Sequence, residues 1–213
     1  MLQAIQLPRL NRLTPSLDST LLKIMEEAGE LARAVLTFLP YESAGRGEGS
    51  AYLRDVADEL LDVAQTCVTM LFVVEEAQQM TVDHLVQQHL DKLTCKGYVF
   101  DAALSYRVAT DGDYKFLQLP RLALPDVTLL TTVCKIQEEV GELSQYLGKK
   151  AGASGETAKL QQAEVLEGCC CELLDVAQCC FTMMYILAER YQMPMETIVK
   201  EHVAKLRRKG YCS

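Results

Sequence analysis

Apolar residues recur every three or four positions through most of the chain, the spacing that places them on one face of an α-helix. In the first half this pattern predicts three helices, over residues 17–36, 51–78 and 81–96. No segment alternates between apolar and polar residues for long, so the sequence predicts no strands and an all-α protein. The clearest apolar stripe belongs to the middle helix and consists of Val56, Leu60, Val63, Cys67, Met70 and Leu71.

The second half of the chain repeats the first. Glu26 and Glu59 correspond to Glu138 and Glu172, at displacements of 112 and 113 residues. Two copies with so long a period indicate a duplicated domain, because solenoid repeats are shorter and more numerous.

The repeat also includes segments without acids. Gln-Leu-Pro-Arg-Leu occurs at 6–10 and 118–122, and Lys-Gly-Tyr follows the third predicted helix in both halves. We therefore predict two helical domains, 1–103 and 116–213. A linker over 104–115 joins them, and its Thr-Asp-Gly-Asp sequence signals a turn.

Acidic residues at helical spacing are the main candidates for chemistry. Glu26, Glu27 and Glu30 can share one face of the first helix, and Glu59 lies three residues before Asp62 on the second. If the two helices pack antiparallel, four or five carboxylates converge. Carboxylates that close raise one another's pKa unless a cation lies between them. Ligation by oxygen alone selects hard ions such as Mg²⁺ or Mn²⁺.

A solvated helix face is the alternative interpretation of the same acids. Lys23 lies four residues before Glu27, and an exposed ion pair at this spacing contributes only about 0.2–0.5 kcal/mol. However, the acids are embedded among apolar residues and occur in both halves. This repetition favours a metal site.

Composition excludes several classes of partner. The formal net charge is −8, whereas binding to a nucleic-acid backbone needs a basic surface. Tryptophan is absent and aromatic residues form 7% of the chain, which disfavours a surface that stacks bases. The first residues lack the pattern of a secretory signal, and the most apolar stretch, 179–188, is too short to cross a bilayer. The sequence therefore predicts a cytoplasmic protein without a membrane partner.

Nine cysteines include a dense group at Cys169, Cys170, Cys171, Cys179 and Cys180. Only one of these five positions is a cysteine in the first half, and adjacent cysteines lack the spacing that directs two thiolates to one zinc ion. We therefore expect small, buried, reduced side chains on a packed helix.

Glu-Glu-x-x-Glu followed about thirty residues later by Glu-x-x-Asp resembles the signature of the MazG-like, all-α nucleoside triphosphate pyrophosphohydrolases. That superfamily also contains dimeric dUTPases, dCTP pyrophosphatases and phosphoribosyl-ATP pyrophosphohydrolase. The resemblance covers approximately 15–98 and 127–211, and both motifs are complete in each half. The interval between the motifs is slightly long, at 28 residues in the first half and 29 in the second.

The resemblance implies Mg²⁺-dependent hydrolysis of a nucleotide between the α and β phosphates, which gives a monophosphate and pyrophosphate. Glu26 and Glu138 would assist a second ion or orient the attacking water. The metal ligands that the resemblance implies are Glu27, Glu30, Glu59 and Asp62 in the first half, and Glu139, Glu142, Glu172 and Asp175 in the second.

Basic residues near the end of each third helix are candidates for phosphate binding, as in similar enzymes. They fall one turn apart, as Lys92 with Lys96 and as Lys205 with Lys209. Complementing the helix dipole is an equally good explanation for lysines at this position.

Two other pairs of polar residues recur in the halves. His89 and His202 are expected to be structural, because a lone helical histidine is more often a satisfied core residue. Gln65 and Gln178 lie one turn after each aspartate and are candidates to face a base.

Members of the MazG-like superfamily pair their subunits into a four-helix core with pockets at the interface. A chain with two such domains can pair them with each other in the same way. We therefore expect a pseudo-twofold internal dimer with two acidic pockets. The sequence leaves a further association between chains open.

Two other functions are alternatives to hydrolysis. A nucleotide- or metal-binding regulatory module with little turnover would not need intact carboxylates in both halves. A di-iron carboxylate bundle would use Glu-x-x-His pairs, which the acidic motifs lack.

Overall fold

The computed structural model describes residues 5–43, 47–77, 82–152 and 162–213, and most of these residues are helical. The prediction of a predominantly helical protein is therefore confirmed. The ends of the predicted helices at 78 and 81 lie outside the described residues. The helices are α1 (Leu17–Phe38), a short 3-10 turn (Leu39–Tyr41), α2 (Ser50–Ala77), α3 (Val82–Cys95), α4 (Leu129–Ala151), α5 (Gln162–Glu189) and α6 (Met195–Arg208).

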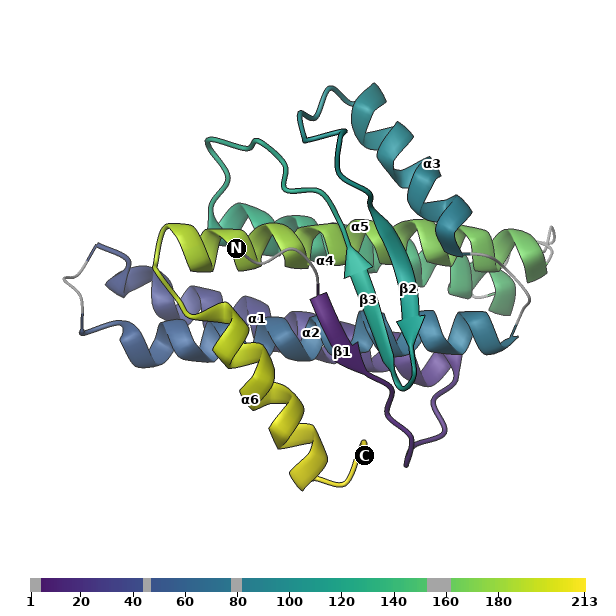
Figure 1. Ribbon diagram of the computed structural model, residues 1–213, viewed down its shortest axis with the longest axis horizontal. Helices are drawn as coiled ribbons and strands as arrows, with labels where there is room; N and C mark the ends of the chain where they lie inside the picture. Colours follow the sequence, from purple (N-terminus) through teal and green to yellow (C-terminus); the bar gives the residue numbers. More distant parts are fainter. Residues whose placement is uncertain (1–4, 44–46, 78–81, 153–161) are drawn as a thin grey trace.

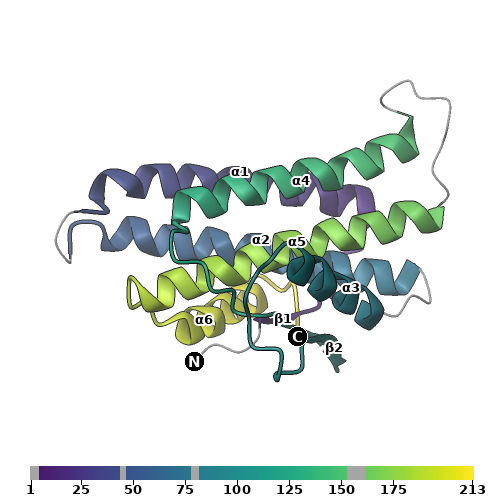
Figure 2. The same ribbon diagram turned by 90° about the horizontal axis from the view of Figure 1, so that it is seen from above.

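The four long helices form two layers, as Figure 2 shows. Helices α1 and α4 lie side by side in the outer layer, and each packs on the helix that follows it, α2 or α5, in the central layer. Helices α3 and α6 and a small sheet cover the other side of that layer. Because α2 and α5 are covered on both sides, the core gathers around them.

Helix α5 is the most enclosed of the four. Its segment Ala163–Glu189 is long and apolar enough to cross a membrane, yet 78% of the most apolar 18 residues in it are buried inside the protein. The apolar stretch 179–188 thus lies within a longer apolar helix. A central position in the bundle accounts for its composition.

Equivalent sequences start α1 and α4 in the same way. The Ser16 side chain accepts a hydrogen bond from the backbone N–H of Ser19, and Thr128 does the same for Thr131. Each is half of a capping box, which satisfies backbone donors that have no partner inside the helix. These caps set where each helix begins and therefore which residues face α2 and α5.

The expectation of no strands was wrong for three short segments. Strands β1 (Ile5–Pro8), β2 (Arg107–Asp111) and β3 (Tyr114–Gln118) form an antiparallel sheet in the order β1-β3-β2 (Figure 1). The region expected to be a linker thus contains β2 and the start of β3. Its predicted turn is the β2–β3 hairpin, where Gly112 has a φ of 56°.

Strand β3 has a lysine at a buried position, so its sequence does not show the alternation of apolar and polar residues that indicates a strand. Lys115 occupies an inward position of the strand and is fully buried. Its ammonium group pairs with Glu75, donates a hydrogen bond to Thr110 Oγ1 at 2.8 Å and lies 4.6 Å from the centre of the Phe72 ring. A buried charge is stable only when it is paired in this way. From the sequence alone, a lysine is expected at the surface, so this position did not indicate a strand.

The two Gln-Leu-Pro-Arg-Leu segments make matching contacts with the central helices. Gln65 donates its amide hydrogen to the carbonyl oxygen of Pro8 at 2.8 Å, and Gln178 to that of Pro120 at 2.9 Å. One residue further on, each arginine pairs with a glutamate near the end of the same helix, at 2.5 Å in both halves. The repeated segments are therefore anchors for the chain that leads into α1 and α4.

The expectation of buried cysteines is met in part. None of the nine, all within the described residues, forms a disulfide bond; Cys169, Cys170 and Cys180 are buried along α5, whereas Cys171 and Cys179 are half-buried. Burial raises the pKa of the Cys170 thiol to about 12, which keeps it protonated and unreactive at neutral pH.

Glycine at position 168 allows α5 to approach α4 closely. A side chain there would overlap the Tyr146 ring, whereas one at Gly141 would have no neighbour within 4 Å. We predict that Gly168→Ala lowers the free energy of unfolding by about 1–3 kcal/mol through overpacking. The matched Gly141→Ala change should raise it by about 0.5–1 kcal/mol, because alanine is the better helix former. Urea unfolding of both variants measures these changes in the free energy of unfolding. Equal changes in the two variants would contradict the close contact between position 168 and Tyr146.

Candidate metal centres

The first centre lies between α1 and α2. Oxygen atoms of Glu27, Glu30 and Glu59 all lie within 4.8 Å of one another. Glu27 is buried and the other two are half-buried. The three carboxylates and Asp62 line a cavity of about 670 Å³, so the first centre opens onto an accessible space.

The second centre lies between α4 and α5. Oxygen atoms of Glu139, Glu142 and Glu172 also lie within 4.8 Å of one another. Glu139 and Glu172 are buried, and Glu142 is exposed. The structure thus brings three of the four expected ligands together in each half.

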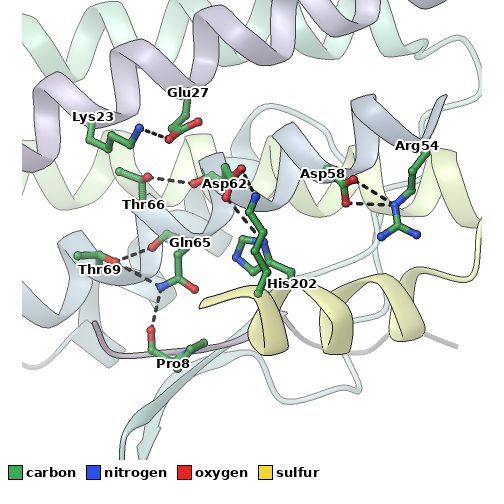
Figure 3. A network of polar contacts seen from close by, with 11 residues as sticks. Pro8, Lys23, Glu27, Arg54, Asp58, Asp62, Gln65, Thr66, Thr69 and His202 are labelled. Carbon is green, nitrogen blue, oxygen red and sulfur yellow. Dashed lines mark hydrogen bonds and ion pairs between the residues drawn. The ribbon is translucent and has the colours of Figure 1, made fainter. Parts of the chain in front are cut away.

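The expected fourth ligands, Asp62 and Asp175, are held by basic residues beside the clusters. Lys205 donates to Asp62 at 3.1 Å, and His202 Nδ1 lies 3.7 Å from the same carboxylate (Figure 3). In the second half, Lys92 pairs with Asp175, and His89 Nδ1 lies 3.1 Å from it. Burial raises the pKa of Asp175, but the hydrogen bonds from His89 and Lys92 outweigh burial and lower it overall.

These contacts exchange the third helices between the halves. Helix α6 packs on α2 and supplies Lys205 to the first centre, whereas α3 packs on α5 and supplies Lys92 to the second. Each centre therefore combines acids of one half with basic residues of the other. Spacing along the sequence carries no information on such an exchange.

His89 and His202 were expected to be structural residues. In the structure each lies beside the aspartate of one centre. Both are buried, and each directs Nδ1 to the aspartate of the other half. Burial lowers the pKa of His202 to about 4, so its ring is neutral at physiological pH. The signal in the sequence was the recurrence of both histidines at the same place in the repeat.

Glu26 and Glu138 are not brought to the clusters. Both side chains are exposed, and they pair with Lys23 at 3.2 Å and Lys135 at 2.8 Å. The hydrogen bond from Lys135 lowers the pKa of Glu138, which makes that carboxylate a weaker base.

The two lysines also bind the buried member of each pair of adjacent acids. Lys23 pairs with Glu27, and Lys135 lies 2.6 Å from Glu139. The ion pair between Lys23 and Glu27, which the alternative interpretation of these acids expected, is therefore present. However, its carboxylate is buried, and its lysine lines the first cavity.

The other candidate residues lie on the cavity walls. Lys205 and Lys209 line the first cavity, and Lys96 lines a second cavity beside Asp175. Gln65 and Gln178 also contribute to these walls, although their amide nitrogens donate to proline carbonyl groups. Figure 3 shows this contact for Gln65 and Pro8.

The electrostatics of both centres fit a hard cation. Burial, followed by the repulsion of neighbouring acids, raises the pKa of Glu59. Burial also raises the pKa of Glu172 to about 7; Lys92 opposes this shift, and three nearby carboxylates add to it. The Oε2 atom of Glu172 is buried and has no hydrogen-bond partner among the described residues. A divalent ion would satisfy this oxygen and remove the repulsion, and an all-oxygen donor set suits Mg²⁺ or Mn²⁺.

Comparison with protein-family models, with curated proteins and with solved structures gave no match to this chain. Its function is therefore inferred from the geometry and chemistry of the two centres.

The raised pKa of Glu172 predicts how metal-free stability depends on pH. The folded-state pKa of about 7 lies above the ordinary value of 4.5, so the fold favours the protonated acid. Its contribution to stability is complete below about pH 4.5 and is lost as the pH rises through 7, by at most about 3 kcal/mol.

Replacement of this acid by its neutral isostere should remove that dependence. In EDTA, Glu172→Gln should flatten the fall in the free energy of unfolding between pH 5 and pH 8, measured with urea. The exposed Glu167 of the same helix provides the control, because Glu167→Gln should retain the wild-type slope. Parallel slopes for all three proteins would show that Glu172 titrates normally.

Proposed function

We propose that the chain is a Mg²⁺-dependent nucleotide pyrophosphohydrolase that cleaves a nucleoside triphosphate between the α and β phosphates. The observation that carries this proposal is the first cavity. Three clustered glutamates and three lysines, Lys23, Lys205 and Lys209, face a space of about 670 Å³, within the range of roughly 300–1,000 Å³ usual for small-molecule sites. The acidic motifs that line it resemble those of the MazG-like enzymes, which supports the same reaction.

The residues of the cavity divide between the parts of such a substrate. Glu27, Glu30 and Glu59 would hold Mg²⁺, which polarises phosphoryl oxygens and lowers the pKa of a bound water. Lys205 of α6 and Lys209, which directly follows that helix, place positive charge on the cavity wall, where it can bind the phosphate chain.

The rest of the cavity is suited to the nucleoside. Its wall is largely apolar, with hydroxyl groups placed at intervals, and this mixture is typical of pockets that enclose a flat organic group. The residues concerned are Leu10, Leu13, Thr14, Pro15, Thr69, Leu206 and Tyr211.

We infer that the two halves, 1–103 and 116–213, form a pseudo-twofold internal dimer in the manner of MazG-like subunits. The support is the set of matching contacts: the capping boxes, the glutamine–proline anchors and the aspartate–lysine pairs each occur once per half. Nine cysteines, none of them in a disulfide bond among the described residues, fit a reducing compartment such as the cytoplasm.

A panel of normal and modified nucleoside triphosphates, incubated with Mg²⁺ or Mn²⁺, tests the reaction. We expect a monophosphate and pyrophosphate as products, and loss of both when EDTA is added. No hydrolysis across the panel, despite measurable Mg²⁺ binding, would favour a binding or regulatory module with the same fold.

Removal of one ligand from each centre tests the assigned residues. Glu30→Gln or Glu142→Gln should remove half of the bound metal, and the double variant should lose turnover. The loss should exceed about 100-fold, because the metal supplies most of the charge stabilisation. Asp55→Asn is the matched control, since it removes one exposed charge from α2 outside the cavity and should leave turnover unchanged. Full Mg²⁺-dependent activity in the double variant would refute the assignment.

A further inference from the structure

The two centres have equivalent acids but different access. The first cavity has a volume of about 670 Å³, and the second has about 160 Å³. Small-molecule sites usually measure roughly 300–1,000 Å³, so the first volume admits a nucleotide and the second does not.

The cavities also differ in which acids they reach. The first is lined by Glu27, Glu30 and Glu59, which are all members of its cluster. Of the second cluster, Glu139 lines the second cavity, whereas Glu142 and Glu172 are absent from its described lining. A ligand in the second cavity therefore meets the edge of the cluster and not its centre.

Substitutions between the repeats account for part of this difference. Leu124 and Val127 line the second cavity at positions that correspond to Arg12 and Pro15 of the first half. Both are half-buried, and the backbone N–H of Ala123, which precedes Leu124, donates to the carbonyl oxygen of Val99 at 2.9 Å. This bond ties the segment before α4 to the chain after α3, next to the two apolar side chains that line the cavity.

The basic residues complete the closure of the second centre. The side chain of Asp175 is 8% exposed, and that of Asp62 is 24% exposed. His89 approaches Asp175 to 3.1 Å, closer than the 3.7 Å between His202 and Asp62. Lys205 lines the first cavity, but its counterpart Lys92, which pairs with Asp175, does not appear in the described lining of the second.

The second cluster nevertheless carries a sign of a cation. Glu172 is more than nine-tenths buried, and its Oε2 atom has no hydrogen-bond partner among the described residues. In the first cluster the corresponding Glu59 is half-buried and faces the cavity. Glu142 of the second cluster is exposed, so a small ion with water ligands can reach the cluster, whereas the cavity of about 160 Å³ is too small for a triphosphate.

We propose that the two centres have different tasks: the first binds the cation together with the triphosphate, and the second binds a cation alone and braces α4 against α5. This inference rests on the proposed function for the identity of the first ligand. It adds that one triphosphate, and not two, binds to each chain. The second cation acts as a structural ion that offsets the repulsion among Glu139, Glu142 and Glu172.

Inorganic tripolyphosphate, the part that all nucleoside triphosphates share, provides a probe that does not depend on the base or on turnover. Isothermal titration of the full chain in Mg²⁺ should give one tripolyphosphate site. Glu59→Gln should weaken this binding by about tenfold or more, as disturbance of a metal site typically does. The matched Glu172→Gln should retain one tripolyphosphate site. It should lower the number of Mn²⁺ ions bound without tripolyphosphate, counted by electron paramagnetic resonance.

Circular dichroism of both variants checks that they fold, so that a loss of binding can be assigned to the centre. Two equal tripolyphosphate sites per chain would overturn the inference. Loss of tripolyphosphate binding in Glu172→Gln but not in Glu59→Gln would do so as well, and so would an absence of binding to the wild-type chain. One site lost only in Glu59→Gln, in a chain that hydrolyses no nucleotide, would support the division of tasks and refute the proposed reaction.

Discussion

The fold holds like charges together at two places, and most of its repeated features serve that arrangement. Three carboxylates within 4.8 Å of one another, partly removed from water, repel each other and lose hydration. Lysines at the i−4 position and on the exchanged third helix offset part of this repulsion. The capping boxes and the glutamine–proline anchors hold the helices in the register that the clusters need. A divalent cation between the three carboxylates of a cluster would offset the rest of this repulsion.

Because α3 packs on α5 and α6 packs on α2, each centre contains residues from both halves of the chain. Asp62 relies on Lys205 and His202 from α6, and Asp175 relies on Lys92 and His89 from α3. Because both aspartates are partly or largely buried, either half alone would leave a carboxylate without its counter-charge. The duplication therefore couples the stability of the halves and their chemistry through the same ion pairs.

The sequence predicted the helices and the meeting of the glutamates, because helical periodicity determines which residues share a face. It did not predict the three strands, since each has only four or five residues and Lys115 replaces an apolar residue at an inward position of β3. Nor did it predict that Asp62 and Asp175 pair with the opposite half. Spacing specifies the face of a helix but not which neighbour covers it, so the separation of Glu26 and Glu138 from the clusters also needed the structure.

A tandem chain can differentiate its two centres in a way that two identical subunits cannot. In a symmetric dimer any substitution alters both sites at once, so a change that closes one pocket closes its mate. Here Leu124 and Cys179 occur at one centre where the other has Arg12 and Thr66. The acidic clusters, in contrast, are the same in both halves. Access to the centre has therefore diverged while the clustered carboxylates have been retained, which is the expected result if the second centre supports the fold and the first carries out the reaction.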